Sequence, residues 1–312
     1  MKGNREGKWK KAVRTLGGIL DKVMAQRCNG YELEYAEANK NNHVRVGLRV
    51  RKEGCNKTMT YYPDIDDMQG DKEVFADKII DLFENEKATP VVSQLTREHL
   101  VENVLPKVFD RKNVSWLKKE GYAVRGTLDF AVALFVPIDA HDGVCKMSYQ
   151  VREEQLESWN MTVDEAYGYA MGNLDKVAVT SPLEKELEAQ GFTKGEDYCE
   201  CPFDLIVATN KESWFGAASI LSRKVQGRLL EFFPGQKVVV VPSSVDEMLA
   251  VGENYVEEGY ANHVVKRVNT MVDPEDRLTN HVYVIAGTPE SPVLMMRGHG
   301  KEYVKQGELM SI

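Results

Sequence analysis

The stretch VVVVPSSVDEMLAV, residues 238–251, indicates the fold most directly. Residues 238–241 form the most strongly β-branched run in the chain, which is typical of a central strand. Pro242 and two serines interrupt this run. Residues 245–251 then form either the return strand of a hairpin or a helix, which Ser244 and Glu247 would begin as a capping box. We favour the hairpin.

The same stretch is the best local candidate for a functional site. Ser243, Ser244, Asp246 and Glu247 place two hydroxyls and two carboxylates just after a central strand, where α/β sheets often bind ligands. Turn formation is the alternative explanation, because Ser and Asp side chains hydrogen-bond to their own backbone in turns. Together with Asn210, which follows another predicted strand, these four are our candidate binding residues.

Strand and helix patterns alternate on both sides of this stretch, which favours an α+β fold. Alternating or continuous apolar residues predict strands at 31–35, 44–50, 58–62, 124–138, 145–151, 204–209 and 281–286. Apolar residues at steps of three and four predict helices at 9–23, 72–86, 96–110, 152–159, 162–176, 183–191 and 254–272, with another beginning at 273.

These elements suggest antiparallel or mixed sheets with packed helices. Polar and charged residues at 111–122 suggest a boundary between an N-terminal sheet-and-helix part, residues 1–115, and a larger C-terminal α+β part with a mixed sheet, residues 116–312. The alternative is that the two parts form one continuous unit.

Composition limits the classes of protein to which the chain can belong. Its 312 residues are 43% apolar and 28% charged, which is enough to bury a core and excludes global disorder. The net charge of −8 argues against a dedicated nucleic-acid-binding protein. No apolar run approaches the ~18 residues of a membrane span, so we expect no membrane contact. The five cysteines are an odd number, which fits a reducing compartment, and we expect a cytoplasmic location.

The sequence contains none of the common motifs for a cofactor, a metal or a nucleophile. The patterns G-x-x-x-x-G-K-[ST], G-x-G-x-x-G, H-E-x-x-H and G-x-S-x-G are absent. The acidic loop that begins at Asp64 is not a calcium loop, because Met68 and Phe75 stand where the EF-hand pattern needs oxygen ligands. We expect no cofactor and no metal.

Charge is concentrated at the N-terminus. Residues 1–27 hold eight Lys or Arg and two acidic residues, a net charge of +6, so the other 285 residues carry −14. The apolar residues of this segment form one stripe of a predicted helix. The basic residues on its other faces are candidates for contact with an anionic partner, and they include Lys8, Lys10, Lys11 and Arg14. The alternative is a helix that docks on its own protein and leaves a solvated basic face.

Several short strings resemble, in order along the chain, an uncharacterised family of bacterial proteins of about this length. They lie at residues 41–54, 129–135, 156–173, 209–218, 242–247, 265–269 and 281–283. The resemblance spans about residues 41–285 and leaves out the basic N-terminal helix. It implies a protein common in anaerobic gut Firmicutes and their mobile elements, and it implies no activity, cofactor or catalytic residue.

Three hypotheses about function follow. The first is a non-enzymatic binding or regulatory protein, linked to a mobile element and partnered by another protein. The second is an enzyme, such as a hydrolase, with a site at residues 243–247. The third is nucleic-acid contact through the basic helix and a predicted strand face that carries Arg45, Arg49 and Arg51. The sequence gives no indication of an oligomeric state.

Overall fold

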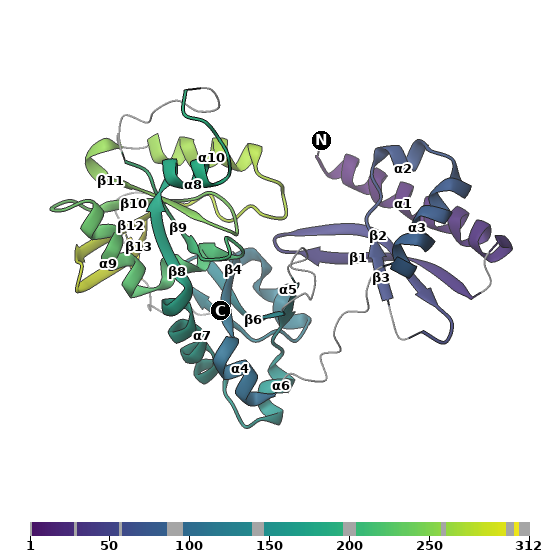
Figure 1. The fold of residues 1–312 in the computed structure, drawn as a ribbon, viewed down its shortest axis with the longest axis horizontal. Helices are drawn as coiled ribbons and strands as arrows, with labels where there is room; N and C mark the ends of the chain where they lie inside the picture. The colour runs from purple at the N-terminus through teal and green to yellow at the C-terminus, as the bar shows by residue number, and fades with distance from the viewer. Residues whose placement is uncertain are drawn as a thin grey trace. The chain divides into compact units, whose positions relative to one another are not determined.

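The computed structural model describes residues 2–27, 30–55, 58–85, 96–138, 147–195, 204–256, 260–297 and 303–305. Its contacts divide the chain into two compact units, residues 1–94 and 95–312 (Figure 1). The division falls earlier in the chain than the boundary at residue 115 considered from the sequence. No described helix is both long and apolar enough to cross a membrane.

The N-terminal unit is a three-stranded antiparallel sheet with helices before and after it in the chain. Its elements are α1 (Lys2–Arg27), β1 (Tyr31–Lys40), β2 (His43–Lys52), β3 (Thr58–Tyr61), α2 (Ile65–Gln69) and α3 (Lys72–Asn85). The strand order is β1-β2-β3, as the alternating pattern of residues 31–62 predicts. A tight turn joins β1 to β2, and Asn41 there has a left-handed backbone with φ of 49°.

The apolar stripe of α1 packs in the core of its own unit. Val13, Leu16, Leu20 and Met24 are buried in one cluster with side chains of β1, β2 and α3. Because α1 and α3 share this cluster, both cover the same face of the sheet. The first helix is therefore a docked element of the N-terminal unit.

The C-terminal unit contains two antiparallel sheets. The smaller has four strands, namely β4 (Leu105–Asp110), β5 (Val124–Thr127), β6 (Phe130–Ile138) and β7 (Met147–Gln150). The larger has the strand order β14-β13-β12-β10-β11-β9-β8. Its strands are β8 (Ala178–Pro182), β9 (Ile206–Asn210), β10 (Val238–Pro242), β11 (Met248–Gly252), β12 (Tyr283–Thr288), β13 (Ser291–Arg297) and β14 (Tyr303–Lys305). The α+β class is confirmed.

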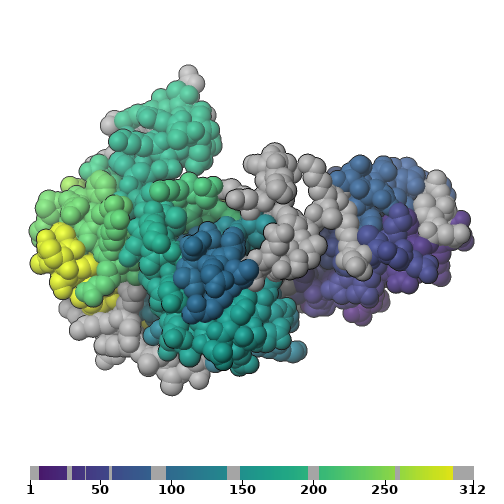
Figure 2. Space-filling model, turned by 60° about the horizontal axis from the view of Figure 1, so that its bottom comes forward, coloured from purple at the N-terminus to yellow at the C-terminus, as the bar shows by residue number. Residues whose placement is uncertain are grey.

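Helices connect and cover these sheets. They are α4 (Arg97–Asn103), α5 (Val114–Lys119), α6 (Glu153–Ser158), α7 (Val163–Val177), α8 (Leu183–Ala189), α9 (Arg223–Phe232) and α10 (Tyr260–Met271), with 3-10 turns η2 (Arg111–Asn113), η3 (Gly216–Leu221) and η4 (Glu253–Tyr255). A capping box of Thr162 and Glu165 begins α7, at the start of the helix predicted for residues 162–176. Asn173 of α7 donates to the carbonyl oxygens of Val101 and Val104, at 2.9 and 3.1 Å. In Figure 2, the blue region of α4 adjoins the teal region that includes α7.

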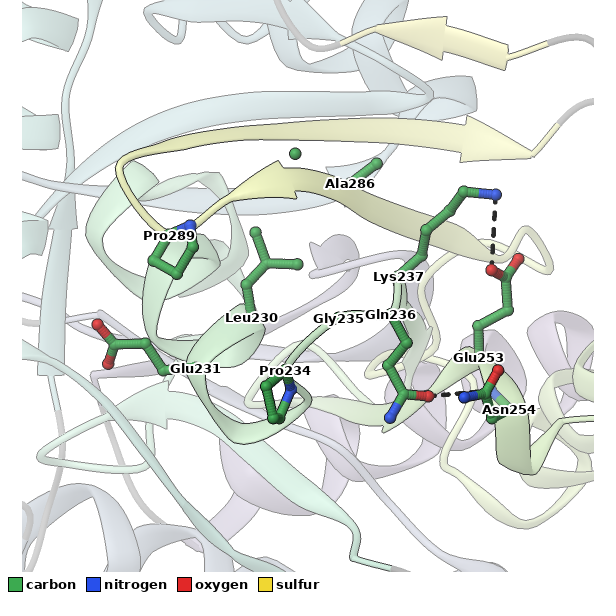
Figure 3. A pocket seen from close by; sticks show the side chains of 11 residues that line it. Leu230, Glu231, Pro234, Gly235, Gln236, Lys237, Glu253, Asn254, Ala286 and Pro289 are labelled. Atoms are coloured by element: carbon green, nitrogen blue, oxygen red, sulfur yellow. Dashed lines mark hydrogen bonds and ion pairs between the residues drawn. The ribbon is translucent and has the colours of Figure 1, made fainter.

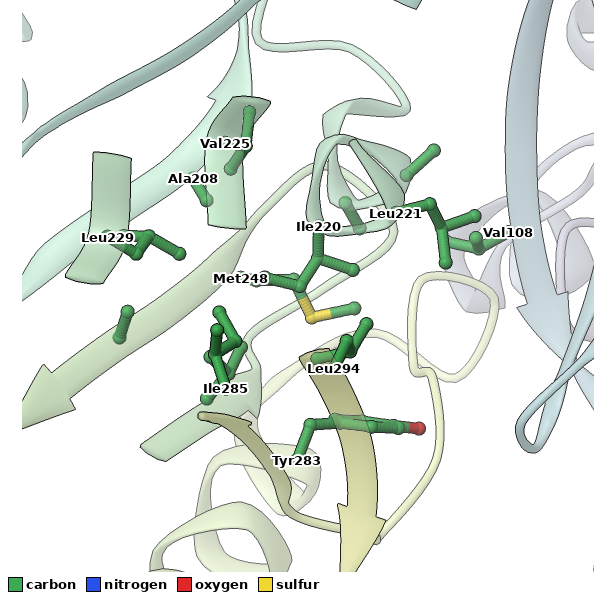
Figure 4. Packing of buried hydrophobic residues seen from close by; sticks show 14 of the residues in the cluster. Val108, Ala208, Ile220, Leu221, Val225, Leu229, Met248, Tyr283, Ile285 and Leu294 are labelled. Carbon is green, nitrogen blue, oxygen red and sulfur yellow. The ribbon is translucent and has the colours of Figure 1, made fainter. Parts of the chain in front are cut away.

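Both faces of β10 are buried, which explains its unbroken valine run. Val238 and Val240 belong to a large cluster with side chains of α9, η3 and the four-stranded sheet. Val239 and Val241 belong to a second cluster, which α10 covers. Residues of the large cluster such as Met248 lie together in Figure 4. The predicted hairpin is confirmed, since β11 pairs antiparallel with β10.

Three sequence expectations were wrong. The single strand expected at residues 124–138 is two antiparallel strands, β5 and β6, joined by a turn at residues 128–129. The helix expected at residues 96–110 ends at Asn103, and its second half is the strand β4. Pro106 gives the reason, because proline in a helix interior removes a hydrogen bond and clashes with the preceding turn. The helix expected to begin at residue 273 is also wrong, since residues 274–276 form only a turn.

Alanine substitutions at two adjacent glycines of α1 test whether this helix docks on β2. A Cβ on Gly17 would lie 2.7 Å from Cδ2 of Leu48 in β2, whereas a Cβ on Gly18 would meet nothing within 4 Å. Gly18→Ala should raise the free energy of unfolding by about 0.5–1 kcal/mol, because alanine has the higher helix propensity. Gly17→Ala should gain less or lose stability. Urea denaturation of the full chain measures both, and an equal gain would contradict the docking of α1 on β2.

Candidate functional site

Polar residues gather at one end of the seven-stranded sheet. Strand β10 runs antiparallel to both β11 and β12, and β9 runs antiparallel to β11. The C-terminal ends of β9 and β10 therefore lie at the same end of the sheet as the N-terminal ends of β11 and β12. This end carries Asn210, the turn at residues 243–247 and the segment that contains His281. The backbone N–H of Val245 donates to the carbonyl oxygen of Asp276 at 2.8 Å, which joins that segment to the turn.

Hydrogen bonds within the 243–247 turn engage the serines and Glu247. The Ser243 hydroxyl donates to Glu247 Oε1 at 2.9 Å, and the backbone N–H of Asp246 donates to Ser244 Oγ at 3.0 Å. The backbone N–H groups of both serines also donate to the Glu247 carbonyl oxygen, at 3.3 Å. These are the bonds that turn formation predicts, and a binding role for these residues stays a prediction.

Asn210 and Asp246, two of the predicted site residues, come together around the loop that follows β9. Asp246 Oδ1 accepts from the backbone N–H of Phe215 at 2.7 Å. Asn210 Oδ1 accepts from the N–H groups of Glu212 and Trp214, at 3.1 and 3.3 Å, and its Nδ2 donates to the Trp214 carbonyl oxygen at 2.8 Å. The two side chains thus shape residues 211–215.

This loop holds its backbone in a strained conformation. Ser213 and Phe215 have φ of 47° and 55°, in the left-handed region that a bulky side chain rarely adopts. The Phe215 ring stacks on Trp214 with 4.5 Å between ring centroids. A Cβ on Gly216 would lie 2.1 Å from Thr209 Oγ1, so only glycine fits after Phe215. Hydrogen bonding and packing together offset the strain.

A second group of polar side chains joins Asp129 to the segment before β12. Nδ1 of His281 lies 2.6 Å from Asp129 Oδ2. The Tyr283 hydroxyl donates to the other carboxylate oxygen, Oδ1. The hydroxyls of Thr279 and Tyr283 are 3.0 Å apart, and Thr279 also accepts from the backbone N–H of His281 at 3.0 Å. Both oxygens of Asp129 therefore have partners on one segment of the chain.

The turn between β5 and β6 presents Asp129. Leu128 takes a left-handed backbone with φ of 52° and is fully buried. Arg111 secures the turn, because its backbone N–H donates to the Asp129 carbonyl oxygen at 3.0 Å and its guanidinium donates to the Leu128 carbonyl oxygen at 3.1 Å. Phe130 then stacks on Tyr283, with 5.0 Å between ring centroids. The Asp129 carboxylate is thus held by backbone bonds as well as by its own partners.

This arrangement sets the protonation chemistry of His281. An ionised carboxylate only accepts hydrogen bonds, so Nδ1 carries the proton and donates it to Asp129. Nε2 is the remaining ring nitrogen, and it has no hydrogen-bond partner within the described part of the chain. The His281 side chain is 44% exposed and that of Asp129 11%. Solvent or a ligand can therefore reach the imidazole while the carboxylate stays largely covered.

Asp129 also shifts the pKa values of its two partners. Its hydrogen bond raises the pKa of His281 above the usual 6.5, against the opposing effect of partial burial, and the negative charges of Asp129 and Asp110 add to the rise. The pKa of Tyr283 is raised well above 10, first by complete burial and then by the charge of Asp129. Tyr283 is therefore neutral and can donate its hydroxyl proton to the carboxylate.

The predicted basic residues of α1 divide into two groups. Lys10 pairs with Glu37 of β1 at 3.1 Å, and the Arg14 guanidinium lies 4.5 Å from the centroid of the Tyr35 ring. These two side chains hold α1 to β1. Lys8 and Lys11 are exposed.

The basic strand face is partly neutralised by cross-strand pairs. Arg49 and Arg51 both pair with Glu34 of β1, at 3.0 and 3.3 Å. The Arg45 guanidinium lies 4.7 Å from the centroid of the Tyr62 ring. This face of the sheet is therefore a mixed surface and not a continuous cationic one.

Within the described ranges, no three His, Cys, Asp or Glu residues are placed to hold a metal ion. The acidic loop before α3 is engaged in local structure. Asp64 and Asp67 form the capping box of α2, and Asp67 also accepts from Tyr61 at 2.8 Å and pairs with Lys78 at 3.0 Å.

Sequence reasoning missed the Asp129–His281 pair. The two residues are 152 positions apart, and no local spacing connects them. Both do occur in strings that carry the resemblance noted above, at residues 129–135 and 281–283. The resemblance pointed to both segments, but it did not show that Asp129 and His281 are in contact.

Comparison with known proteins gives one match. The model of a family described as "Family of unknown function (DUF5688)" matches residues 16–285. The match covers part of α1, which the resemblance left out. No curated protein and no solved structure matches the chain.

Proposed function

We propose that this chain, which belongs to the family of unknown function DUF5688, is an enzyme that transfers protons through His281 in its C-terminal unit. The observation that carries the proposal is the 2.6 Å contact between Asp129 and His281, at the end of the sheet where Asn210 and the 243–247 turn also lie. An imidazole oriented by a covered carboxylate is one arrangement that supports general acid–base catalysis.

The proposed chemistry uses the two ring nitrogens differently. In the neutral imidazole, Nδ1–H is donated to Asp129, so Nε2 carries the lone pair and can take a proton from water or a substrate hydroxyl. Asp129 then stabilises the imidazolium that forms, and Nε2 returns the proton to the leaving group. Tyr283 and Thr279 are positioning residues, because they hold Asp129 and the backbone of His281.

Hydrolysis is the reaction class that this geometry favours. Among the described residues, no Ser, Thr or Cys side chain is hydrogen-bonded to Nε2 of His281. We therefore expect the imidazole to activate water directly instead of a side-chain nucleophile. Asn210 and the residues of the 243–247 turn are the proposed substrate-binding groups.

Chromogenic substrates test this proposal. The full chain is assayed with p-nitrophenyl acetate, p-nitrophenyl phosphate and bis-p-nitrophenyl phosphate. His281→Gln should lower kcat/KM by about 10²–10⁴-fold, the usual contribution of a general acid–base group. The rate should rise with pH as the imidazole loses its proton, with a midpoint above 6.5 because Asp129 raises the pKa of His281.

The control is His263→Gln, because His263 is an exposed histidine of α10 in the same unit and should leave the rate unchanged. Asp129→Asn should lower the rate and shift the pH midpoint down toward 6.5. The proposal fails if the wild-type chain hydrolyses none of the three substrates. It also fails if His281→Gln retains the wild-type rate.

A specific observation favours a second function, the binding of an anionic partner by the N-terminal unit. Lys8, Lys11 and Lys22 are exposed, and the helical step of 100° per residue places all three opposite the buried stripe of α1. We propose this lysine ridge as a contact for an acidic protein or a nucleic-acid backbone. A regulatory role, a link to mobile elements and a cytoplasmic location stay predictions from the sequence.

Charge removal is the appropriate test of the lysine ridge. Deletion of residues 1–27 would also remove four core side chains of the N-terminal unit. The triple substitution Lys8→Gln, Lys11→Gln and Lys22→Gln should weaken binding to a labelled DNA duplex or to polyglutamate. For the duplex, three lost phosphate contacts should reduce the slope of log K against log salt by about 3.

A matched control removes three exposed lysines of the C-terminal unit, Lys185, Lys211 and Lys266. It changes the net charge equally and should leave the salt dependence as in the wild type. Equal losses of binding affinity in the two triple variants would show that binding depends only on the total charge of the protein. That result, or no binding of either polymer, would contradict the proposed ridge.

A further inference from the structure

A surface pocket lies at the opposite end of the seven-stranded sheet from His281. It is formed where α9 ends, where β10 and η4 begin, and at the turn between β12 and β13 (Figure 3). Its volume is about 630 Å³, within the usual range of small-molecule sites. Its walls include the side chains of Leu230, Glu231, Lys237, Glu253, Ala286 and Pro289.

The apolar part of the lining is firmly built. Leu230 is buried, and Ala286 and Pro289 line the pocket beside it. A Cβ on Gly227 would lie 2.4 Å from the Pro289 carbonyl oxygen, so α9 packs directly against the turn that carries Pro289. Gly287, with φ of 101°, makes this turn possible. The pocket therefore has a fixed apolar wall.

The polar part of the lining has an excess of negative charge. The lining residues include two carboxylates, Glu231 and Glu253, and one ammonium, that of Lys237. Lys237 lies beside Glu253, and Glu231 lies on the other side of the pocket (Figure 3). Lys237 and Glu253 are 3.5 Å apart, and both side chains are almost half exposed. This separation exceeds the ~2.7–2.9 Å of a strong charge-assisted hydrogen bond. Glu231 has no ion pair or hydrogen bond to any residue that the structure describes.

The end of α9 adds to this negative character. Glu231 lies in the last turn of the helix, which contains no basic residue. The exposed carbonyl groups at a helix C-terminus carry a partial negative charge that favours cations. A hydrogen bond also joins two residues at the edge of the pocket, because Gln236 Oε1 accepts from the backbone N–H of Asn254 at 3.1 Å.

We propose that this pocket binds a small aliphatic amine. Its ammonium group would pair with Glu231 or Glu253, and its hydrocarbon chain would lie on Leu230, Ala286 and Pro289. A diamine would engage both carboxylates. The site does not depend on the acid–base chemistry of His281, because it lies at the other end of the sheet.

A pair of five-carbon probes tests the proposal. Cadaverine carries an ammonium group at each end, and glutarate carries a carboxylate at each end of a chain of the same length. Isothermal titration of the full chain should show binding of cadaverine and none of glutarate. Glu231→Gln and Glu253→Gln should each weaken cadaverine binding on the order of tenfold, as expected when a charged hydrogen-bond acceptor is lost.

The control is Glu188→Gln, an exposed carboxylate of α8 that does not line the pocket. It changes the net charge by the same amount and should leave the affinity unchanged. The variant Ala286→Leu should also abolish binding, because it fills the pocket without removing charge. The proposal is overturned if cadaverine does not bind, if glutarate binds equally well, or if Glu188→Gln weakens binding as much as the pocket variants.

Discussion

Burial of β10 on both faces is the constraint on which the C-terminal unit depends. One face packs against α9, η3 and the four-stranded sheet, and α10 covers the other. A strand between two cores cannot carry polar side chains, since each would lose its hydration without a partner. β10 itself therefore carries only apolar side chains, and the polar groups of the sites proposed in this unit lie at or beyond the ends of the strands. The two sites that we propose in the C-terminal unit lie at these two ends.

The end that carries His281 shows how buried polar groups are accommodated. Tyr283 is fully buried, yet its hydroxyl is bonded to both Asp129 and Thr279. Asp129 is nearly buried, and both of its carboxylate oxygens accept hydrogen bonds. His281 is the member of this network that remains exposed, and the network holds its ring. A covered acceptor and an exposed imidazole follow from the same packing that buries β10.

The sequence predicted the parts of this fold that local patterns encode. The valine run predicted β10 and its hairpin, and the apolar stripe of residues 9–23 predicted the helix α1, with docking on its own protein as one of two alternatives. The apolar spacing of residues 162–176 predicted α7. The helix expected at residues 96–110 failed because Leu105 and Val108 fit a helical spacing as well as a strand, and Pro106 decided between them.

The candidate site was predicted only in part. The side chains of Asn210 and Asp246 both hydrogen-bond to the backbone of one loop, and this brings them together. No spacing in the sequence reveals this arrangement. The pairing of Asp129 with His281 depends on how the two sheets of the C-terminal unit pack. Such a contact requires the three-dimensional structure, because its members are 152 residues apart.

The protonation of His281 tests the account most directly. A pH titration of the imidazole signals by NMR, with His281→Gln to assign the resonance, measures its pKa. The account predicts a pKa above 6.5 in the wild-type chain, with the proton of the neutral ring on Nδ1, and a fall toward 6.5 in Asp129→Asn. A pKa at or below 6.5 that Asp129→Asn leaves unchanged would show that the carboxylate does not orient this histidine, and it would contradict the proposed site.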